Sequence, residues 1–228
     1  SAGRRPATSL RGETMIKLYG TSISNYYSTA KAALLEKNLA FTEVQLFPGQ
    51  NEEILRLNPM GKVPFIEVDG QMLSETNVLF DYFEELQPDP PLYPTTPWAR
   101  AKARELVRVV ELYLDAPARR HIAAVYFGAA VDPETAEAVR PELEKGLRAL
   151  RAMARFQPYI AGETFGYADI SAYFQLRFAN LHTEHVYGWD LTADVPGLKD
   201  YLEHVGTRPH IRAVDERMRQ DFSAFKNR

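Results

Sequence analysis

The most informative segment of this chain is residues 58–76, N-P-M-G-K-V-P-F-I-E-V-D-G-Q-M-L-S-E-T. A strand-like run, residues 65–68, begins directly after Pro64 and ends at the turn pair Asp69-Gly70. A second short apolar run then leads into Ser74-Glu75-Thr76, which is typical of a helix start. Two such runs separated by an Asp-Gly pair predict a β-hairpin. We therefore expect a hairpin whose second strand leads into a helix.

Pro64 stands at the mouth of the predicted strand and limits how that strand can pair. Proline has no N–H, so it fits the first residue of a strand or a sheet edge. In a cis Val63-Pro64 bond, the N–H and C=O of Val63 would face outward, where the backbone of a small peptide ligand can pair with them. Only about 5–6% of X-Pro bonds in folded proteins are cis, so the dipeptide by itself favours an ordinary trans proline.

Taken together, N-P-M-G-K-V-P, the Asp-Gly hairpin and S-E-T closely resemble the glutathione-binding segment of the cytosolic glutathione transferases, where the valine–proline bond is cis. Residues 15–20, M-I-K-L-Y-G, resemble the first strand of that family, and a polar turn with Ser24 and an Ala- and Leu-rich helix follow. Residues 161–163 and 167–170 are similar to the start of its sixth helix. The resemblance extends from about Met15 to the C-terminus. It implies an α/β thioredoxin-like N-terminal domain followed by an all-α helical domain.

The composition narrows the classes of function. A length of 228 residues with 45% hydrophobic residues allows one large or two small domains, and a net charge of −3 provides no basic field for nucleic acid. No stretch approaches the roughly 20 apolar residues of a membrane-spanning helix. The absence of cysteine excludes disulfides, thiolate metal sites and a protein-thiol nucleophile. Any thiol chemistry must therefore use a thiol of the ligand.

Residue patterns also predict an N-terminal leader and a linker between two domains. Residues 1–14 contain three arginines and no hydrophobic region typical of a secretory signal, so we expect a disordered leader or tag and a cytoplasmic protein. A transit peptide and a mis-assigned start before Met15 stay open for this segment. Residues 88–97 are rich in proline and predict a linker between domains at 15–87 and 98–228.

The secondary structure expected for the two domains differs in kind. In the first domain we expect strands at 16–19 and 41–47 around a helix that ends at 37–38, then a short helix at 52–57, the hairpin, and a helix at 76–86. In the second domain we expect helices at 99–126, 133–156, 167–182, 196–206 and 209–219. Pro133, Pro196 and Pro209 suit first-turn positions, where a missing N–H costs nothing.

Ser24 is the candidate catalytic residue. Its position before a helix also suits an N-cap, in which the hydroxyl accepts an N–H and contributes about 1 kcal/mol. The resemblance implies a second role, because this position matches the serine that activates glutathione in serine-type transferases. A free thiol with a pKa of about 8.5 is only a few per cent thiolate at pH 7. A hydroxyl donor contributes about 1.5–3 kcal/mol and the helix N-terminus about 0.3–1, which together suffice to favour the thiolate.

Four other residues are candidate glutathione contacts besides Val63. The N–H groups at the helix start and the Thr76 hydroxyl suit a carboxylate, and Glu75 suits an ammonium group, so the pair fits a γ-glutamyl head. An ordinary helix start with an acidic residue explains the same pattern. Lys62 suits the glycine carboxylate of the ligand, or is simply a solvated lysine. The resemblance implies the ligand-binding role for these positions, with Pro64 shaping the backbone.

The helical domain offers weaker signals. Tyr113, Tyr126, Phe127 and His121 are candidates either for an apolar co-substrate pocket or for the core. His182 and His185 lie three residues apart without a further ligand pattern, so we expect surface histidines and no metal site. Asp169 is expected to be structural, at a helix start where Gly166 cannot donate a side-chain bond.

These features predict a glutathione transferase that conjugates the glutathione thiolate to a small hydrophobic electrophile. The resemblance also implies a homodimer with glutathione as co-substrate. Two alternatives stay open from the sequence: a glutathione-dependent disulfide or peroxide reductase, and a non-catalytic glutathione-binding or regulatory module. The identity of the electrophile is not encoded in a pattern that can be read from the chain.

Overall fold

The computed structural model describes residues 15–227, so the expectation for residues 1–14 lies outside the described part. The N-terminal part contains four strands and three helices, in the order β1 (Ile16–Gly20), α1 (Asn25–Glu36), β2 (Phe41–Gln45), α2 (Glu52–Leu57), β3 (Phe65–Val68), β4 (Gln71–Ser74) and α3 (Thr76–Leu86). The sheet order is β2-β1-β3-β4, with β1 parallel to β2 and antiparallel to β3. The predicted hairpin is formed by β3 and β4.

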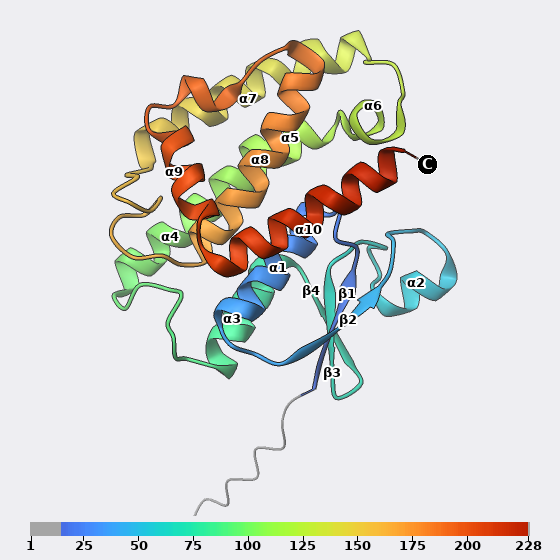
Figure 1. Ribbon diagram of the computed structural model, residues 1–228, viewed down its shortest axis with the longest axis vertical. Coiled ribbons are helices and arrows are strands. Elements are labelled where there is room, and N and C mark those ends of the chain that lie inside the picture. The colour runs from blue at the N-terminus through green and yellow to red at the C-terminus, as the bar shows by residue number, and fades with distance from the viewer. Residues whose placement is uncertain (1–14, 228) are drawn as a thin grey trace, which may run out of the picture.

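One face of this sheet carries the core of the N-terminal part. Ile16 and Leu18 alternate inward along β1, as expected for a half-buried strand. Helices α1 and α3 pack together and lie on the same side of the sheet, whereas α2 lies on the opposite side (Figure 1). Buried Leu34 from α1 and Phe80 and Phe83 from α3 complete this core. The predicted thioredoxin-like arrangement is therefore confirmed.

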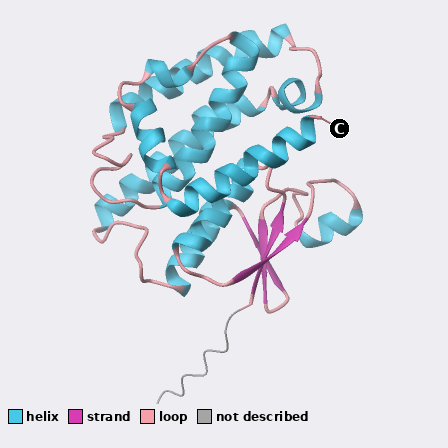
Figure 2. Ribbon diagram, viewed as in Figure 1, coloured by secondary structure: helices cyan, strands magenta, loops and turns pink. Residues whose placement is uncertain are grey.

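The rest of the chain is helical, as Figure 2 shows. Its elements are α4 (Pro97–Val110), the π-helix η1 (Glu111–Asp115), α5 (Ala116–Arg119), α6 (Ile122–Phe127), α7 (Pro133–Met153), α8 (Tyr167–Tyr187), the 3-10 helix η2 (Leu191–Asp194), α9 (Leu198–Gly206) and α10 (Pro209–Lys226). Helix α8 is central, because most of its side chains are buried against its neighbours. No helix within residues 15–227 is long and apolar enough to cross a bilayer.

The expectation of one continuous helix over residues 99–126 is wrong. The segment changes into the π-helix at Glu111–Asp115 and breaks again before α6. Pro117 has no N–H to donate to the C=O of Tyr113, and a local π-turn is a common way to accommodate such a gap. The irregular turns bring Asp115 and Arg119 against the N-terminus of α1.

The start of α9 also differs from the expectation. Gly197, with φ of 83°, is the N-cap of α9, so Pro196 precedes the helix and does not occupy its first turn. The left-handed backbone at Gly197 ends the preceding segment before the helix begins. The other two prolines, Pro133 and Pro209, do occupy first-turn positions of α7 and α10.

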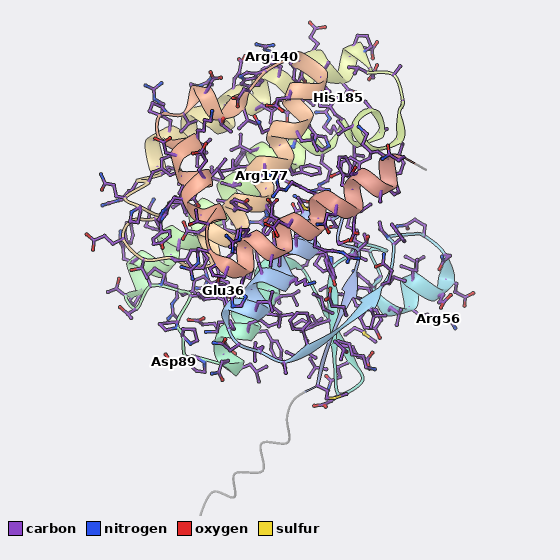
Figure 3. All side chains as sticks on the ribbon, viewed as in Figure 1. Glu36, Arg56, Asp89, Arg140, Arg177 and His185 are labelled. Atoms are coloured by element: carbon purple, nitrogen blue, oxygen red, sulfur yellow. The ribbon has the colours of Figure 1, made fainter. Side chains whose placement is uncertain are left out.

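Two ion pairs involve neighbouring residues at the C-terminal end of α1. Lys37 is fully buried, and its Nζ lies 2.8 Å from Oε2 of Glu84 in α3 and 2.5 Å from the C=O of Pro90. Removing one partner of such a buried pair costs about 3–5 kcal/mol. Glu36 accepts hydrogen bonds from the guanidinium of Arg208, and Figure 3 labels Glu36 where α1 meets α10. The Glu36–Arg208 pair therefore joins the N-terminal part to the helical domain.

Candidate active site

A cavity of about 640 Å³ lies between the N-terminal part and the helical domain. The predicted site residues Ser24, Lys62, Val63, Pro64, Glu75 and Thr76 all line it. They come from three places: the start of α1, the loop before β3 and the start of α3. The fold thus brings all six together around one space.

The loop before β3 presents an unpaired stretch of backbone to the cavity. The Val63-Pro64 peptide bond is cis. Within residues 15–227, neither the N–H nor the C=O of Val63 has a hydrogen-bond partner. Asn58 holds the loop in place, because its Nδ2 donates to the C=O of Lys62 at 2.8 Å. Val63 therefore offers one donor and one acceptor to an extended peptide.

The start of α3 has the features of an anion site. Glu75 is its N-cap, with a positive φ of 71° and no side-chain cap bond. In the described part of the chain, the N–H groups of Thr76 and Asn77 and the Thr76 hydroxyl have no acceptor. Free N–H groups and the helix dipole together favour a carboxylate. The exposed Glu75 carboxylate lies next to this site and suits an ammonium group.

Ser24 is the N-cap of α1. Its Oγ accepts a hydrogen bond from the N–H of Tyr27 at 3.3 Å. This contact uses a lone pair of the oxygen, so the hydroxyl hydrogen stays available, and it has no acceptor among the described residues. The capping role and the donor role of Ser24 are therefore compatible.

The polar side chains next to Ser24 are hydrogen-bonded to other residues of the protein. Ser22 donates to Asp221, and Asn25 and Tyr26 donate to Asp115 at 2.6 Å and 2.9 Å. Burial and the negative charge of Asp115 raise the pKa of Tyr26, which disfavours its phenolate. The phenol of Tyr19 donates to Glu67 at 2.6 Å, so it too has a partner other than a ligand.

The helical domain contributes a mostly apolar half of the cavity. Its apolar lining residues are Leu112, Ala116, Ile122, Tyr126, Phe127, Phe178 and Phe225. Of the four candidates named from the sequence, Tyr126 and Phe127 belong to this lining and Tyr113 and His121 do not. His121 is buried, and its Nε2 lies 2.9 Å from the Tyr187 hydroxyl.

The expectation of a surface position for His182 is wrong. The side chain is fully buried on α8, and its ring lies 4.0 Å from the ring of Phe178, centroid to centroid. Burial lowers the pKa of His182 to about 4, so the imidazole is neutral at pH 7. Within residues 15–227, no group of three or more His, Asp or Glu side chains is arranged to hold a metal ion.

A polar cluster at this cavity was missed in the sequence. Asp115 is fully buried and receives hydrogen bonds from Asn25, Tyr26 and Arg119. Burial raises the pKa of Asp115, and the contact with Arg119 opposes that shift. The spacing of Asp115 and Arg119, four residues apart in a helical segment, was the available signal. Their contact with α1 depends on the π-helix, which no simple pattern predicts.

Comparison with known families gives a consistent result. Residues 18–91 match the family model of the N-terminal domain of glutathione S-transferases, and residues 133–204 match that of the C-terminal domain. The chain is similar to a glutathione S-transferase of Pseudomonas putida, with 42% identity over 200 residues, 88% of this chain and 91% of the relative. It is also similar to glutathione S-transferase 2 of Saccharomyces cerevisiae, with 28% identity over 87% of this chain and 89% of the relative.

Solved structures agree with the fold described above. A glutathione S-transferase from Rhodospirillum rubrum superposes with a TM-score of 0.71 at 28% identity and covers 88% of this chain and 91% of its own. One from Methylobacterium radiotolerans, in complex with glutathione sulfonate, gives a TM-score of 0.72 at 22% identity over 88% of this chain and 94% of its own. The second likeness shows the fold alone.

Proposed function

Because this chain belongs to the glutathione S-transferase family and uses glutathione as its co-substrate, we propose that Ser24 stabilises the glutathione thiolate for attack on a small hydrophobic electrophile. The observation that carries the proposal is the convergence of the six site residues on one cavity, with the free hydroxyl hydrogen of Ser24 at the N-terminus of α1. A donor hydroxyl and a helix N-terminus both favour a negative sulfur.

The tripeptide is held by backbone and charge together. Val63 pairs with the central peptide of glutathione through its unpartnered N–H and C=O, in the manner of an added strand. Thr76 and the start of α3 receive the γ-glutamyl carboxylate, and Glu75 receives its ammonium group. Lys62, exposed beside Val63, neutralises the glycine carboxylate, and Pro64 keeps the loop in the required shape.

The apolar half of the cavity then receives the electrophile. Binding both reactants next to each other converts a bimolecular reaction into one between oriented neighbours, which lowers the barrier. The sulfur forms a bond to an electrophilic carbon. Phe178, Tyr126 and Phe127 supply the aromatic walls that favour an apolar body of the electrophile.

The substitution Ser24→Ala tests the activating role. The variant loses the donor to the sulfur, and kcat/KM for conjugation falls by about 10- to 100-fold, equal to roughly 1.4–2.7 kcal/mol. Ultraviolet absorbance of the bound thiolate, followed against pH, reports a thiol pKa that moves up toward that of free glutathione.

Loss of the cap needs its own control, because Ser24→Ala also removes a helix cap. Thr96 caps α4 in the same way, accepting from the N–H of Ala99 at 3.3 Å, and does not line the cavity. Thr96→Ala therefore loses similar stability and keeps full activity. Unchanged turnover in Ser24→Ala would remove Ser24 from the proposed role.

The proposal includes a homodimer. Asp81 of α3 forms an ion pair with Arg104 of α4, and Val78 of α3 and Trp98 of α4 expose large apolar side chains. A second copy that covers this face would remove both side chains from water, which is favourable. Light scattering is expected to give twice the chain mass of 25.9 kDa.

A further inference from the structure

The start of α1 is held by a buried carboxylate of the helical domain. Asp115, the last residue of η1, is fully buried and does not line the cavity. Its Oδ2 accepts from Nδ2 of Asn25 at 2.6 Å, and its Oδ1 accepts from the hydroxyl of Tyr26 at 2.9 Å. These two donors are the first two residues of α1 and directly follow Ser24. One group of the helical domain thus holds the end of α1 that carries the proposed thiol activator.

Ser24 moves with the first turn of α1. Its C=O accepts from the N–H of Ser28 at 3.0 Å, and its Oγ accepts from the N–H of Tyr27 at 3.3 Å. Both bonds belong to the turn that begins with Asn25 and Tyr26. A displacement of those two residues would therefore carry with it the Ser24 hydroxyl and the free N–H groups at the helix start.

The carboxylate of Asp115 is itself fixed by its surroundings. Helix α7 packs directly on η1, since a Cβ added at Gly146 would lie 2.3 Å from the C=O oxygen of Tyr113. Glycine allows two backbones to approach this closely. Arg119 donates from Nε and Nη2 to Asp115 at 3.0 Å and 2.9 Å, and from Nη2 to Oδ1 of Asn25 at 2.8 Å. Asp115 therefore holds α1 from a well-defined position.

Stability alone is a weak reason for this buried ion pair. Removing two charges from water costs several kcal/mol per ion, and apolar residues of similar volume often stabilise a protein as well or better. The pair of Asp115 and Arg119 does provide acceptors and a donor of fixed direction to the first turn of α1. Directional bonds specify one position for a helix end, which apolar contacts specify less sharply.

We infer that Asp115 is a positioning residue for the glutathione thiolate: by holding Asn25 and Tyr26, it sets where the Ser24 hydroxyl and the N-terminus of α1 meet the sulfur. This inference rests on the proposed function, since Ser24 is the donor that is positioned. Donors act best on a charge when they are already in place, because no reorganisation is then needed. The helical domain thereby contributes to thiol activation through a residue that lies outside the cavity.

The test has to separate position from charge. Removing Asp115 alone would leave Arg119 uncompensated, and its positive charge would lower the pKa of the bound thiol while lost positioning raises it. The double variant Asp115→Leu/Arg119→Met removes both charges together and replaces each side chain by an apolar one of similar shape. The other charged residues that line the cavity, Lys62, Glu75 and Glu111, stay unchanged.

Tyr26→Phe is a milder variant that keeps every charge. It loses the hydroxyl that donates to Asp115 and retains the ring and the contact of Asn25, so it keeps the inference testable should the double variant not fold. The double variant in turn excludes a direct role of the Tyr26 hydroxyl. That hydroxyl is freed when Asp115 is replaced, and a direct donor to the sulfur would then lower the thiol pKa.

The readout is the pKa of the bound thiol, followed by ultraviolet absorbance in the complex with glutathione alone. We expect a rise of about one unit in Asp115→Leu/Arg119→Met, the ten-fold change that a hydrogen bond to a charged group can supply, and a smaller rise in Tyr26→Phe. In a Ser24→Ala background the double variant adds less than it does alone, because the positioned donor is already gone.

The matched control is the ion pair at the opposite end of α1. Glu36→Leu/Arg208→Met also removes two charges that join α1 to the helical domain, and neither residue lines the cavity. Urea unfolding reports the change in stability of both double variants. The control keeps the thiol pKa of the unmodified protein.

Three results would overturn the inference. They are a thiol pKa that stays constant or falls in the folded Asp115 and Tyr26 variants, an equal rise in the Glu36 control, and a fully additive rise in the Ser24→Ala background. An equal rise in the control would assign the effect to domain docking as a whole. A failure of the proposed function is seen separately, because the thiol bound to the unmodified protein would then have the pKa of free glutathione.

Discussion

The two halves of the cavity are built in different ways. The half proposed for glutathione comes mainly from residues 58–76 and the start of α1, and much of what it offers is backbone: the free groups of Val63 and the N–H groups at the start of α3. The half proposed for the electrophile comes from side chains of η1, α5, α6, α8 and α10. Backbone sites suit a constant ligand, whereas side-chain walls can change by single substitutions.

The same difference appears in the polar groups. In the N-terminal half, the donors and acceptors stay free and face the cavity. In the helical half, the polar groups of Asp115 and Arg119 are mostly satisfied by one another and by α1, and a single guanidinium edge stays free among the described residues. Recognition in that half thus depends on packing more than on hydrogen bonds.

The largest expected effect is on stability, and it comes from His182, which packs against side chains that line the electrophile half. His182 lies beneath Tyr126 and Phe178 and has a pKa of about 4, against 6.5 for an ordinary histidine, first because of burial and then because of the nearby charges of Arg119, His121 and His185. The unfolded chain therefore binds the proton more readily. This contribution to stability is complete above pH 6.5 and is lost as the pH falls toward 4, with a total of about 3 kcal/mol.

Urea unfolding at several pH values measures this effect. His182→Phe removes the titrating group. Between pH 6.5 and 4, the free energy of unfolding of this variant therefore falls by about 3 kcal/mol less than that of the unmodified protein. His204→Phe replaces an exposed histidine on α9 that is not among the groups shifting the pKa of His182, and it is the control, which keeps the original slope. An identical slope in all three proteins would show that the charge state of His182 is not linked to folding.

An intermediate effect is expected from the loop that carries Val63. Gly61 has a φ of 64°, and a Cβ added there would lie 2.1 Å from the C=O oxygen of Gly49. Gly61→Ala therefore strains the backbone and displaces one loop from the other. We expect a loss of about 2 kcal/mol of stability and a weaker affinity for glutathione, measured by calorimetry.

The variant Gly70→Ala separates the cost of a left-handed backbone from the effect of displacing the loop. Gly70 also has a positive φ, 77°, but a Cβ there meets no atom within 4 Å. Gly70→Ala thus reports the cost of the left-handed backbone alone, about 1 kcal/mol, and leaves glutathione affinity intact. Equal glutathione affinity in both variants would contradict the view that backbone geometry creates this half of the site.

The sequence predicted the N-terminal half well for a physical reason. Helices α2 and α3 have the bounds expected for them, and the hairpin strands lie where the Asp69-Gly70 turn places them. Each of these elements is specified by a short-range signal, such as a turn pair, a cap or an alternation of apolar residues. The same signals place Val63, Glu75 and Thr76 on consecutive elements, and the resemblance to glutathione transferases named them together as ligand contacts.

The helical half was harder because its decisive contacts are long-range. The π-helix at Glu111–Asp115 rotates the segment after it, and the contact of Arg119 with Asn25 joins residues 94 positions apart. Periodicity identifies a helix but gives its register only to within a few residues, so pocket and core side chains on α6 and α8 could not be separated. His182 was misjudged for this reason, since its burial depends on helices distant in sequence.

The smallest expected effect lies at the rim of the electrophile half, and it tests how separate the two halves are. Phe127 is 68% exposed at the end of α6, and its ring lies 5.8 Å from that of Phe225. Because water already covers most of this ring, Phe127→Ala changes stability by less than about 0.5 kcal/mol. A bound electrophile, however, would lose one aromatic wall, so its KM rises by about five-fold while the KM for glutathione stays constant.

Tyr113→Ala is the matched control for this rim. Tyr113 is 45% exposed on η1 and does not line the cavity, so its loss changes neither KM. If Phe127→Ala raised both KM values together, the rim would be coupled to the glutathione half. The helical walls would then have to be treated as part of a single binding surface, because a change confined to an exposed ring can reach the backbone site only through shared packing.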